Sequence, residues 1–137
     1  MSLTRKEGRV LAFQGLCAWD AGSALSDVFL YSWIEDDKLS SIEKEELLFP
    51  TLLIRGTLDH IDEIDAKIKR QLEHWDFSRL NSLDKANLRL GVYSLLYQKD
   101  VPSSVVISEA VHIAEEYGTD QSYKFVNGIL DSIKNSL

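Results

Sequence analysis

The sequence predicts an all-α fold, with about six or seven helices in two packed bundles that share one core. Only two prolines interrupt its 137 residues, and the alternating polar and apolar runs that are typical of strands are absent. Apolar residues instead recur at helical spacing along most of the chain. The length suits a single domain, with an N-terminal bundle at about 1–75 and a C-terminal bundle at about 82–137.

The N-terminal part begins with a predicted helix over residues 4–20. Gly8, Ala12 and Gly15 lie along one side of this helix, where small side chains would let another helix approach closely. Each glycine nevertheless costs about 1 kcal/mol of helix propensity. A short second helix is predicted over residues 26–34, where aromatic and apolar side chains cluster.

A polar loop is predicted at 35–41, followed by a long helix over residues 42–74. Ser40 is expected to cap that helix, because a glutamate follows three residues later and completes a capping box. Pro50 fits only if it lies within the first turns or kinks the helix. A break into two helices near His60 is the alternative, and the sequence leaves it open.

A connector is predicted at 75–83, with Asp76 or Ser82 available as helix caps. The next helix is expected to span residues 84–98, because its leucines and valine recur at helical spacing. At the start of this helix Asp84 would be an ordinary N-cap residue, which is one explanation for an acidic side chain there.

Two further helices form a hairpin joined at Gly118, which is expected to adopt a left-handed conformation. Asp120 would cap the second helix. The apolar stripe of the second helix passes through Asn-Gly at 127–128, so we predict helix there despite the usual turn preference of that pair. Phe125 opens this stripe and is predicted to be a core anchor.

Composition and charge bound the class of protein. The chain is 45% hydrophobic and 27% charged, as in a folded protein, and its net charge of −7 disfavours non-specific binding of nucleic acids. A single cysteine excludes an internal disulfide, and we find neither a signal peptide nor an apolar run long enough to span a bilayer. We therefore expect a cytoplasmic protein. No metal-ligand spacing, phosphate loop or catalytic cluster indicates a cofactor, a metal or an enzyme.

The first turn of the first helix is locally basic, with Arg5, Lys6 and Arg9 close together. Arg5 and Arg9 are four residues apart and share one helix face. Guanidinium groups can bind phosphate through two hydrogen bonds and can stack on planar rings. Spacing alone favours a simpler interpretation, in which these residues form a solvated chain end.

The C-terminal hairpin carries a more specific pattern. Its residues are Val101-Pro102, Val105, Ile107, Glu109-Ala110-Val111, Ala114, Gly118, Ser122, Lys124-Phe125-Val126-Asn127-Gly128 and Leu130-Asp131. The helix that starts at Asp84 and the first helix, with Arg9, Ala12, Gln14, Leu16 and Trp19, extend it. With this pattern the chain resembles the NusB family of bacterial transcription antitermination factors. It departs from the family at Gly8, Gly15, Cys17 and Ser108.

The resemblance implies two groups of RNA-binding residues and one partner surface. The first group is Arg5, Lys6, Arg9 and Gln14, and the second is Ser122, Tyr123, Lys124 and Asn127. In the second group an amide can read a base edge, a lysine can meet a phosphate and a tyrosine can stack on a base. Asp84 and Arg89 would lie at the surface that the family uses to bind NusE, a ribosomal protein of the small subunit.

The function that the resemblance implies is assembly on RNA. The chain would bind boxA-type single-stranded RNA together with NusE, as part of the RNA polymerase antitermination complex, and support transcription of ribosomal RNA operons. It would act as a monomer or weak homodimer. One alternative is a domain related to RNA cytosine methyltransferases, which would need a catalytic domain that a chain stopping at Leu137 does not provide. Another is a helical scaffold that binds only proteins.

Overall fold

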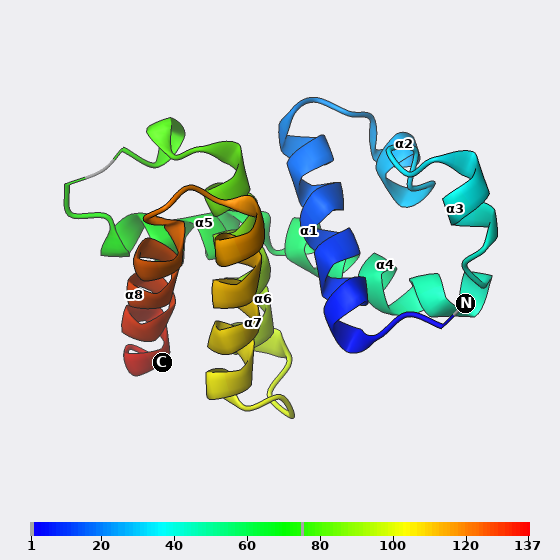
Figure 1. The fold of residues 1–137 in the computed structure, drawn as a ribbon. Coiled ribbons are helices and arrows are strands. Elements are labelled where there is room, and N and C mark those ends of the chain that lie inside the picture. The colour runs from blue at the N-terminus through cyan, green and yellow to red at the C-terminus, as the bar shows by residue number, and fades with distance from the viewer. Residues whose placement is uncertain (1, 75) are drawn as a thin grey trace.

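The computed structural model describes residues 2–74 and 76–137, and every regular element within them is helical (Figure 1). The α-helices are α1 (Arg5–Asp20), α2 (Leu25–Phe29), α3 (Asp36–Ser40), α4 (Leu48–Asp59), α5 (Ile61–Gln71), α6 (Ser82–Tyr97), α7 (Ser103–Tyr117) and α8 (Ser122–Asn135), with 3-10 turns η1 (Lys44–Leu47) and η2 (Phe77–Arg79). The all-α prediction is confirmed, with slightly more helices in this part of the chain than expected.

Buried apolar side chains form two clusters, and α6 contributes to both. Ala86 and Leu90 belong to the first cluster, with side chains of α1, α2 and α4. Leu88, Val92 and Leu95 belong to the second, with side chains of α5, α7 and α8. Residues on different faces of one helix therefore hold the two halves of the molecule together.

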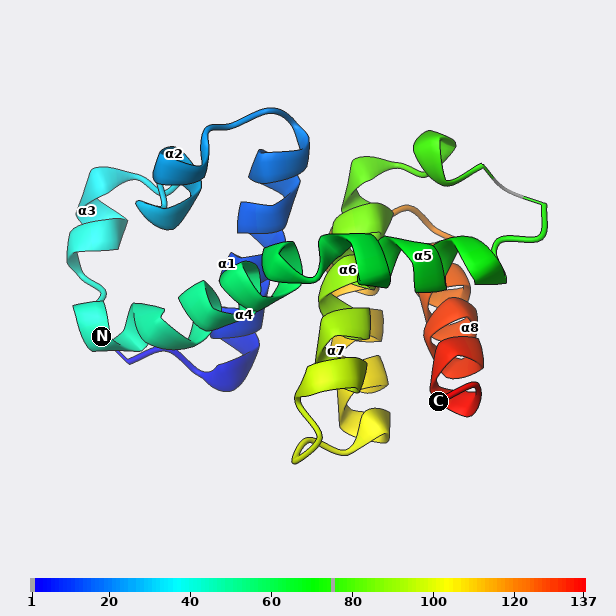
Figure 2. The ribbon, with the colours of Figure 1, turned by 180° about the vertical axis from the view of Figure 1, so that it is seen from behind.

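Figure 2 shows α4 and α5 running one after the other along the back of the molecule, across both halves. The break between them falls at His60, as in the alternative to one long helix over 42–74. Pro50 is the third residue of α4, where its missing N–H removes no intrahelical hydrogen bond. The sequence allowed both interpretations, because apolar residues recur at helical spacing on both sides of His60.

α1 packs against α4 through its glycines, as predicted. A Cβ atom on Gly15 would lie 2.7 Å from Cδ1 of Ile54, and one on Gly8 would lie 2.8 Å from Cδ2 of Phe49. The predicted start is also confirmed, because Thr4 caps α1 by accepting a hydrogen bond from the backbone N–H of Glu7 at 3.0 Å.

The helix predicted over 26–34 is shorter, because α2 ends at Phe29. Two residues later Tyr31 has a φ of 57°, in the left-handed region that a helix cannot continue through. Its ring is 2% exposed, and its hydroxyl lies 2.7 Å from Oγ1 of Thr51 on α4. A tertiary contact that local periodicity does not encode therefore ends the helix.

The segment 35–41, predicted as a polar loop, contains α3. Its two N-terminal aspartates suit the positive end of the helix dipole, and Leu39 packs against the first cluster. The prediction that Ser40 caps the following helix is wrong. Ser40 is the last residue of α3, and its hydroxyl donates to the carbonyl oxygen of Asp37 at 3.1 Å.

Side chains of the connector before α6 cap two helical elements, η2 and α6. Asp76 caps η2 as predicted, since its Oδ1 accepts from the backbone N–H of Ser78 at 3.0 Å. Ser82 is not the cap of α6. That role belongs to Asn81, whose Oδ1 accepts from the N–H of Asp84 at 2.8 Å. Asp84 is therefore the third helical residue and not the N-cap.

The α7–α8 hairpin is confirmed, with α8 passing through 127–128 as one helix. Gly118 does not adopt the predicted left-handed conformation, because its φ and ψ of −89° and −169° are extended. Asp120 does not cap α8. The turn is held instead by Ser122, whose Oγ accepts from the backbone N–H of Thr119 at 2.9 Å.

Phe125 is only half-buried, so its prediction as a core anchor is wrong. Val126, Leu130 and Ile133 are the apolar α8 residues that are at most 1% exposed. They lie at helical spacing and define the centre of the buried face, whereas Phe125 packs at its margin against the second cluster. The apolar stripe was correct but was centred one residue too early.

Candidate functional site

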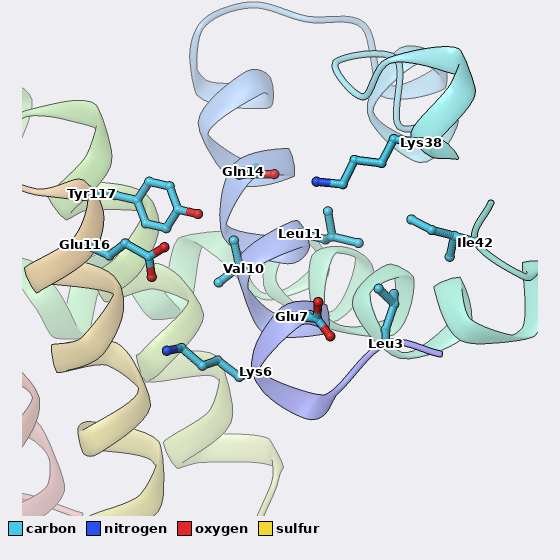
Figure 3. Close-up of a pocket in the computed structure, with 10 residues that line it drawn as sticks. All are labelled: Leu3, Lys6, Glu7, Val10, Leu11, Gln14, Lys38, Ile42, Glu116 and Tyr117. Atoms are coloured by element: carbon cyan, nitrogen blue, oxygen red, sulfur yellow. The ribbon is translucent and has the colours of Figure 1, made fainter. Parts of the chain in front are cut away.

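A groove of about 360 Å³ lies where α1, the segment around α3 and the end of α7 meet (Figure 3). Its lining residues are Leu3, Lys6, Glu7, Val10, Leu11, Gln14, Lys38, Ile42, Glu116 and Tyr117. The aliphatic members form an apolar floor, and the polar members come from three separate elements. Two predicted RNA-binding residues, Lys6 and Gln14, therefore share one concave surface.

Beside the groove, the two predicted arginines of α1 meet one carboxylate on α7. Arg5 donates from Nε and Nη2 to Glu109, at 3.0 and 3.3 Å. Nε of Arg9 lies 3.5 Å from Oε1 of Glu109, the oxygen that also accepts from Nη2 of Arg5. Nη1 of Arg9 donates to Oγ of Ser94 on α6 at 3.0 Å. The prediction that Arg5 and Arg9 share one helix face is confirmed.

Arg9 is not part of a solvated basic surface, because it is 1% exposed. Burial lowers the pKa of its guanidinium to about 10, although the neighbouring Glu109 raises it, so Arg9 stays charged at neutral pH. The Arg5 side chain is 41% exposed and also lies over the Phe49 ring, 5.4 Å from its centroid. Of the two arginines, Arg5 is the one that solvent or a ligand can reach.

Glu109 is one residue of this site that the sequence did not reveal as functional. It was visible as part of the family pattern, but it stands 104 positions from Arg5. No local spacing connects residues that far apart. Only the packing of α7 beside α1 brings the carboxylate between the two guanidinium groups.

Gln14 is oriented by a neighbour from the α2–α3 segment. Nε1 of Trp33 donates to Oε1 of Gln14 at 3.1 Å, which leaves the amide nitrogen of Gln14 as the donor available to a ligand. Lys6 is exposed at the rim of the same groove. Together they offer hydrogen-bond donors next to an apolar floor.

The second predicted group lies in the first turns of α8. Tyr123, Lys124 and Asn127 are exposed, and the Lys124 ammonium lies over the Tyr123 ring at 5.8 Å from its centroid. Ser122 is 1% exposed and is engaged with Thr119, so it stabilises the turn. Three of the four residues are therefore accessible to a ligand.

The structure does not bring the two groups together into one cluster. In both views α7 lies between α1 and α8 (Figures 1 and 2). A single-stranded ligand that touched both groups would have to pass over α7. The two groups are thus candidate contacts for different parts of one extended ligand.

The predicted partner residues are buried, contrary to the expectation of an exposed acidic start on α6. Asp84 is 8% exposed and Arg89 is 6% exposed. Arg89 donates from Nε and Nη2 to Asp65 at 2.9 and 3.0 Å, and from Nη1 to Asp20 at 3.1 Å. Arg89 therefore ties α6 to α5 and α1, and a role for either residue in partner binding stays a prediction.

Two classes of site are not found in the described part of the chain. No helix within residues 2–74 and 76–137 is long and apolar enough to cross a membrane. The same residues hold no group of three or more histidine, cysteine, aspartate or glutamate side chains arranged to bind a metal ion.

Comparison with known proteins identifies close relatives. The model of the NusB family matches residues 6–135. Transcription antitermination protein NusB of Treponema denticola is 52% identical over 136 residues, 98% of this chain and 98% of that protein. The structure of T. maritima NusB has a TM-score of 0.84 at 36% identity, covering 98% of this chain and 93% of that chain. A structure of antitermination factors NusB and NusE in complex with dsRNA has a TM-score of 0.78 at 28% identity, covering 97% of each chain.

Proposed function

The chain belongs to the NusB family of transcription antitermination factors, and from this premise we propose that it binds boxA-type single-stranded RNA together with NusE. In this role it works in the cytoplasm within the RNA polymerase antitermination complex and supports transcription of ribosomal RNA operons. It acts by binding and assembly, as a monomer or weak homodimer, and not by making or breaking bonds.

One observation carries the RNA half of this proposal. Arg5 and Lys6 are adjacent exposed cations on α1, and Lys6 lines a groove that also presents the amide of Gln14. The side-on edge of the Arg5 guanidinium is held by Glu109, which leaves its end-on edge for a phosphate. Such a local basic edge binds a polyanion despite the net charge of −7, because screening limits repulsion from distant carboxylates.

The NusE half rests on a relative whose structure contains NusB, NusE and dsRNA. On this chain, Asp84 and Arg89 would act mainly by fixing the start of α6 against α5 and α1, since both side chains are buried. Their substitution would then lower NusE affinity through a displaced helix start. Calorimetry with Asp84→Asn, which keeps an oxygen acceptor for Asn81, tests whether the charge itself is needed.

A titration of labelled boxA-type RNA, followed by fluorescence anisotropy with and without NusE, tests the proposal. Replacing Arg5 and Lys6 by alanine should lower the log-log salt slope by about 1.4, or about 0.7 for each phosphate of the single strand that is no longer neutralised. Arg9 is kept, because it is buried. Arg70→Ala with Lys99→Ala removes the same charge from exposed positions elsewhere and serves as the matched control.

Sequence discrimination is tested separately at α8. Asn127→Ala should leave the salt slope unchanged while narrowing the difference in affinity between matched and scrambled RNA, because an amide reads bases and not phosphates. If the α1 variant and its control lose RNA affinity equally, the basic turn makes no specific RNA contact and contributes only to the overall charge of the protein. Wild-type protein that binds NusE but no RNA would instead support a protein-only scaffold.

A further inference from the structure

The groove of Figure 3 is lined by a lysine, Lys38, that the sequence analysis did not assign to a binding site. Lys38 belongs to α3, in the segment that was expected to be a loop, and its exposed side chain reaches over the groove toward α1. Lys6 approaches the same groove from the first turn of α1. Two ammonium groups from elements far apart in sequence therefore face one concave surface.

Two carboxylates share the groove, so its charge is mixed. Glu7 is already engaged, because its Oε1 accepts from the backbone N–H of Thr4 at 2.9 Å. The pKa of Glu7 is lowered chiefly by this hydrogen bond and by the Thr4 hydroxyl, with a smaller effect of the Lys38 charge. Glu116 lies beside Tyr117 at the opposite wall (Figure 3). A phosphate would therefore lie at Lys38, and Glu116, toward which the ammonium group of Lys6 points in Figure 3, would exclude a second phosphate from that end of the groove.

The interior of the groove suits a flat, partly apolar group. Val10 and Leu11 form its floor, and the hydroxyl of Tyr117 points into it (Figure 3). The Tyr117 ring is fixed by packing on Phe13, with 5.5 Å between ring centroids. Its volume of about 360 Å³ lies within the range of small-ligand sites.

We propose that this groove binds one unstacked nucleotide of the RNA, with its phosphate at Lys38 and its base on Val10 and Leu11, within reach of the Tyr117 hydroxyl. This inference rests on the proposed function and adds Lys38 and Tyr117 to the RNA-binding residues. It also gives α3 a role, because that short helix carries a ligand-binding side chain to α1. Single-stranded RNA suits such a site because its bases can be splayed out into pockets.

The phosphate contact is tested with Lys38→Ala in the full chain, using labelled single-stranded boxA-type RNA. The salt slope should fall by about 0.7, which corresponds to roughly 5-fold weaker binding at about 0.1 M salt. Lys38→Arg should restore binding. Lys44→Ala removes an equal charge from an exposed neighbouring turn and should leave affinity and slope as in the wild type.

The base contact is tested with Tyr117→Phe, which keeps the packing on Phe13. Affinity should fall by about 2- to 10-fold, as expected when one hydrogen bond is removed, with an unchanged salt slope. Circular dichroism checks that each variant is folded. Wild-type affinity in either Lys38→Ala or Tyr117→Phe overturns the proposal, as does an equal loss in Lys38→Ala and Lys44→Ala. Failure of the proposed function itself looks different, since the wild-type protein would then bind no RNA.

Discussion

At the scale of single residues, Arg9 and Arg5 separate two roles that the sequence presents as one. Both guanidinium groups meet Glu109, yet Arg9 is 1% exposed and reaches Ser94, whereas the side chain of Arg5 is 41% exposed. A buried charge must keep its partners, because leaving either ion uncompensated is costly. Arg9 therefore belongs to the framework, and Arg5 belongs to the surface that a ligand meets.

We expect Arg9→Ala to destabilise the fold by about 3 kcal/mol, because it removes the packed side chain and leaves Ser94 without its donor. Arg5→Ala is the matched control and should cost less than about 1 kcal/mol, as for other exposed ion pairs. Urea unfolding of both variants measures the difference. Similar losses in the two variants would mean that Arg9 has no special structural role.

At the scale of elements, the helical glycines differ in whether packing requires them. Gly15 lets α4 approach α1, since a Cβ would meet Ile54 at 2.7 Å and Trp33 at 3.1 Å. Gly128 lies within α8 with nothing within 4 Å of the place where a Cβ would be. The same residue type is thus a packing requirement in one helix and a cost to helix stability in another.

Alanine substitutions at these two glycines should therefore have opposite effects. Gly128→Ala is expected to stabilise the protein by about 1 kcal/mol, which is the difference in helix propensity. Gly15→Ala should destabilise it by about 1–3 kcal/mol, because Ile54 is fully buried and must shift. Thermal unfolding of the two variants side by side measures both signs. A destabilised Gly128→Ala would point to a backbone contact at that position.

The contribution of the α1 capping box to protein stability should depend on pH. Hydrogen bonds from Thr4 lower the pKa of Glu7 below its ordinary value of 4.5. Because the folded pKa is the lower one, the contribution of Glu7 to stability is present above the unfolded value and is lost as pH falls through the folded value. The stability difference between wild type and Glu7→Gln should therefore shrink below about pH 4.5. Melting temperatures measured from about pH 7 to pH 3 test this.

At the scale of the whole molecule, most of the fold was predictable from the sequence, because most of it is encoded locally. Apolar periodicity identified α1, α6, α7 and α8. Small residues on α1 predicted that another helix would approach it closely, and the structure shows that this helix is α4. The errors occur where a contact with a residue distant in sequence determines where a helix ends or which of its faces is buried. Tyr31 ends α2 through its burial against α4, and the centre of the α8 stripe depends on which neighbours cover it.

The candidate site follows the same division. Arg5 and Lys6 were predictable because they lie in one basic helical turn, and Gln14 was predictable because it belongs to the family pattern. Glu109 and Lys38 were not assigned to the site, since only tertiary packing brings α7 and α3 to α1. The burial of Arg9 was missed for the same reason, because its partners are in other helices.

The sharing of α6 between the two apolar clusters has a consequence for the order in which the chain is made. The first cluster needs Ala86 and Leu90 of α6 and Ile113 of α7, all of which are synthesised after the helices they cover. While the chain is still growing, α1, α2 and α4 therefore expose an unfinished apolar face to the cell. We expect a nascent chain at this stage to be recognised by chaperones, because its first half can close only when α6 and α7 have left the ribosome.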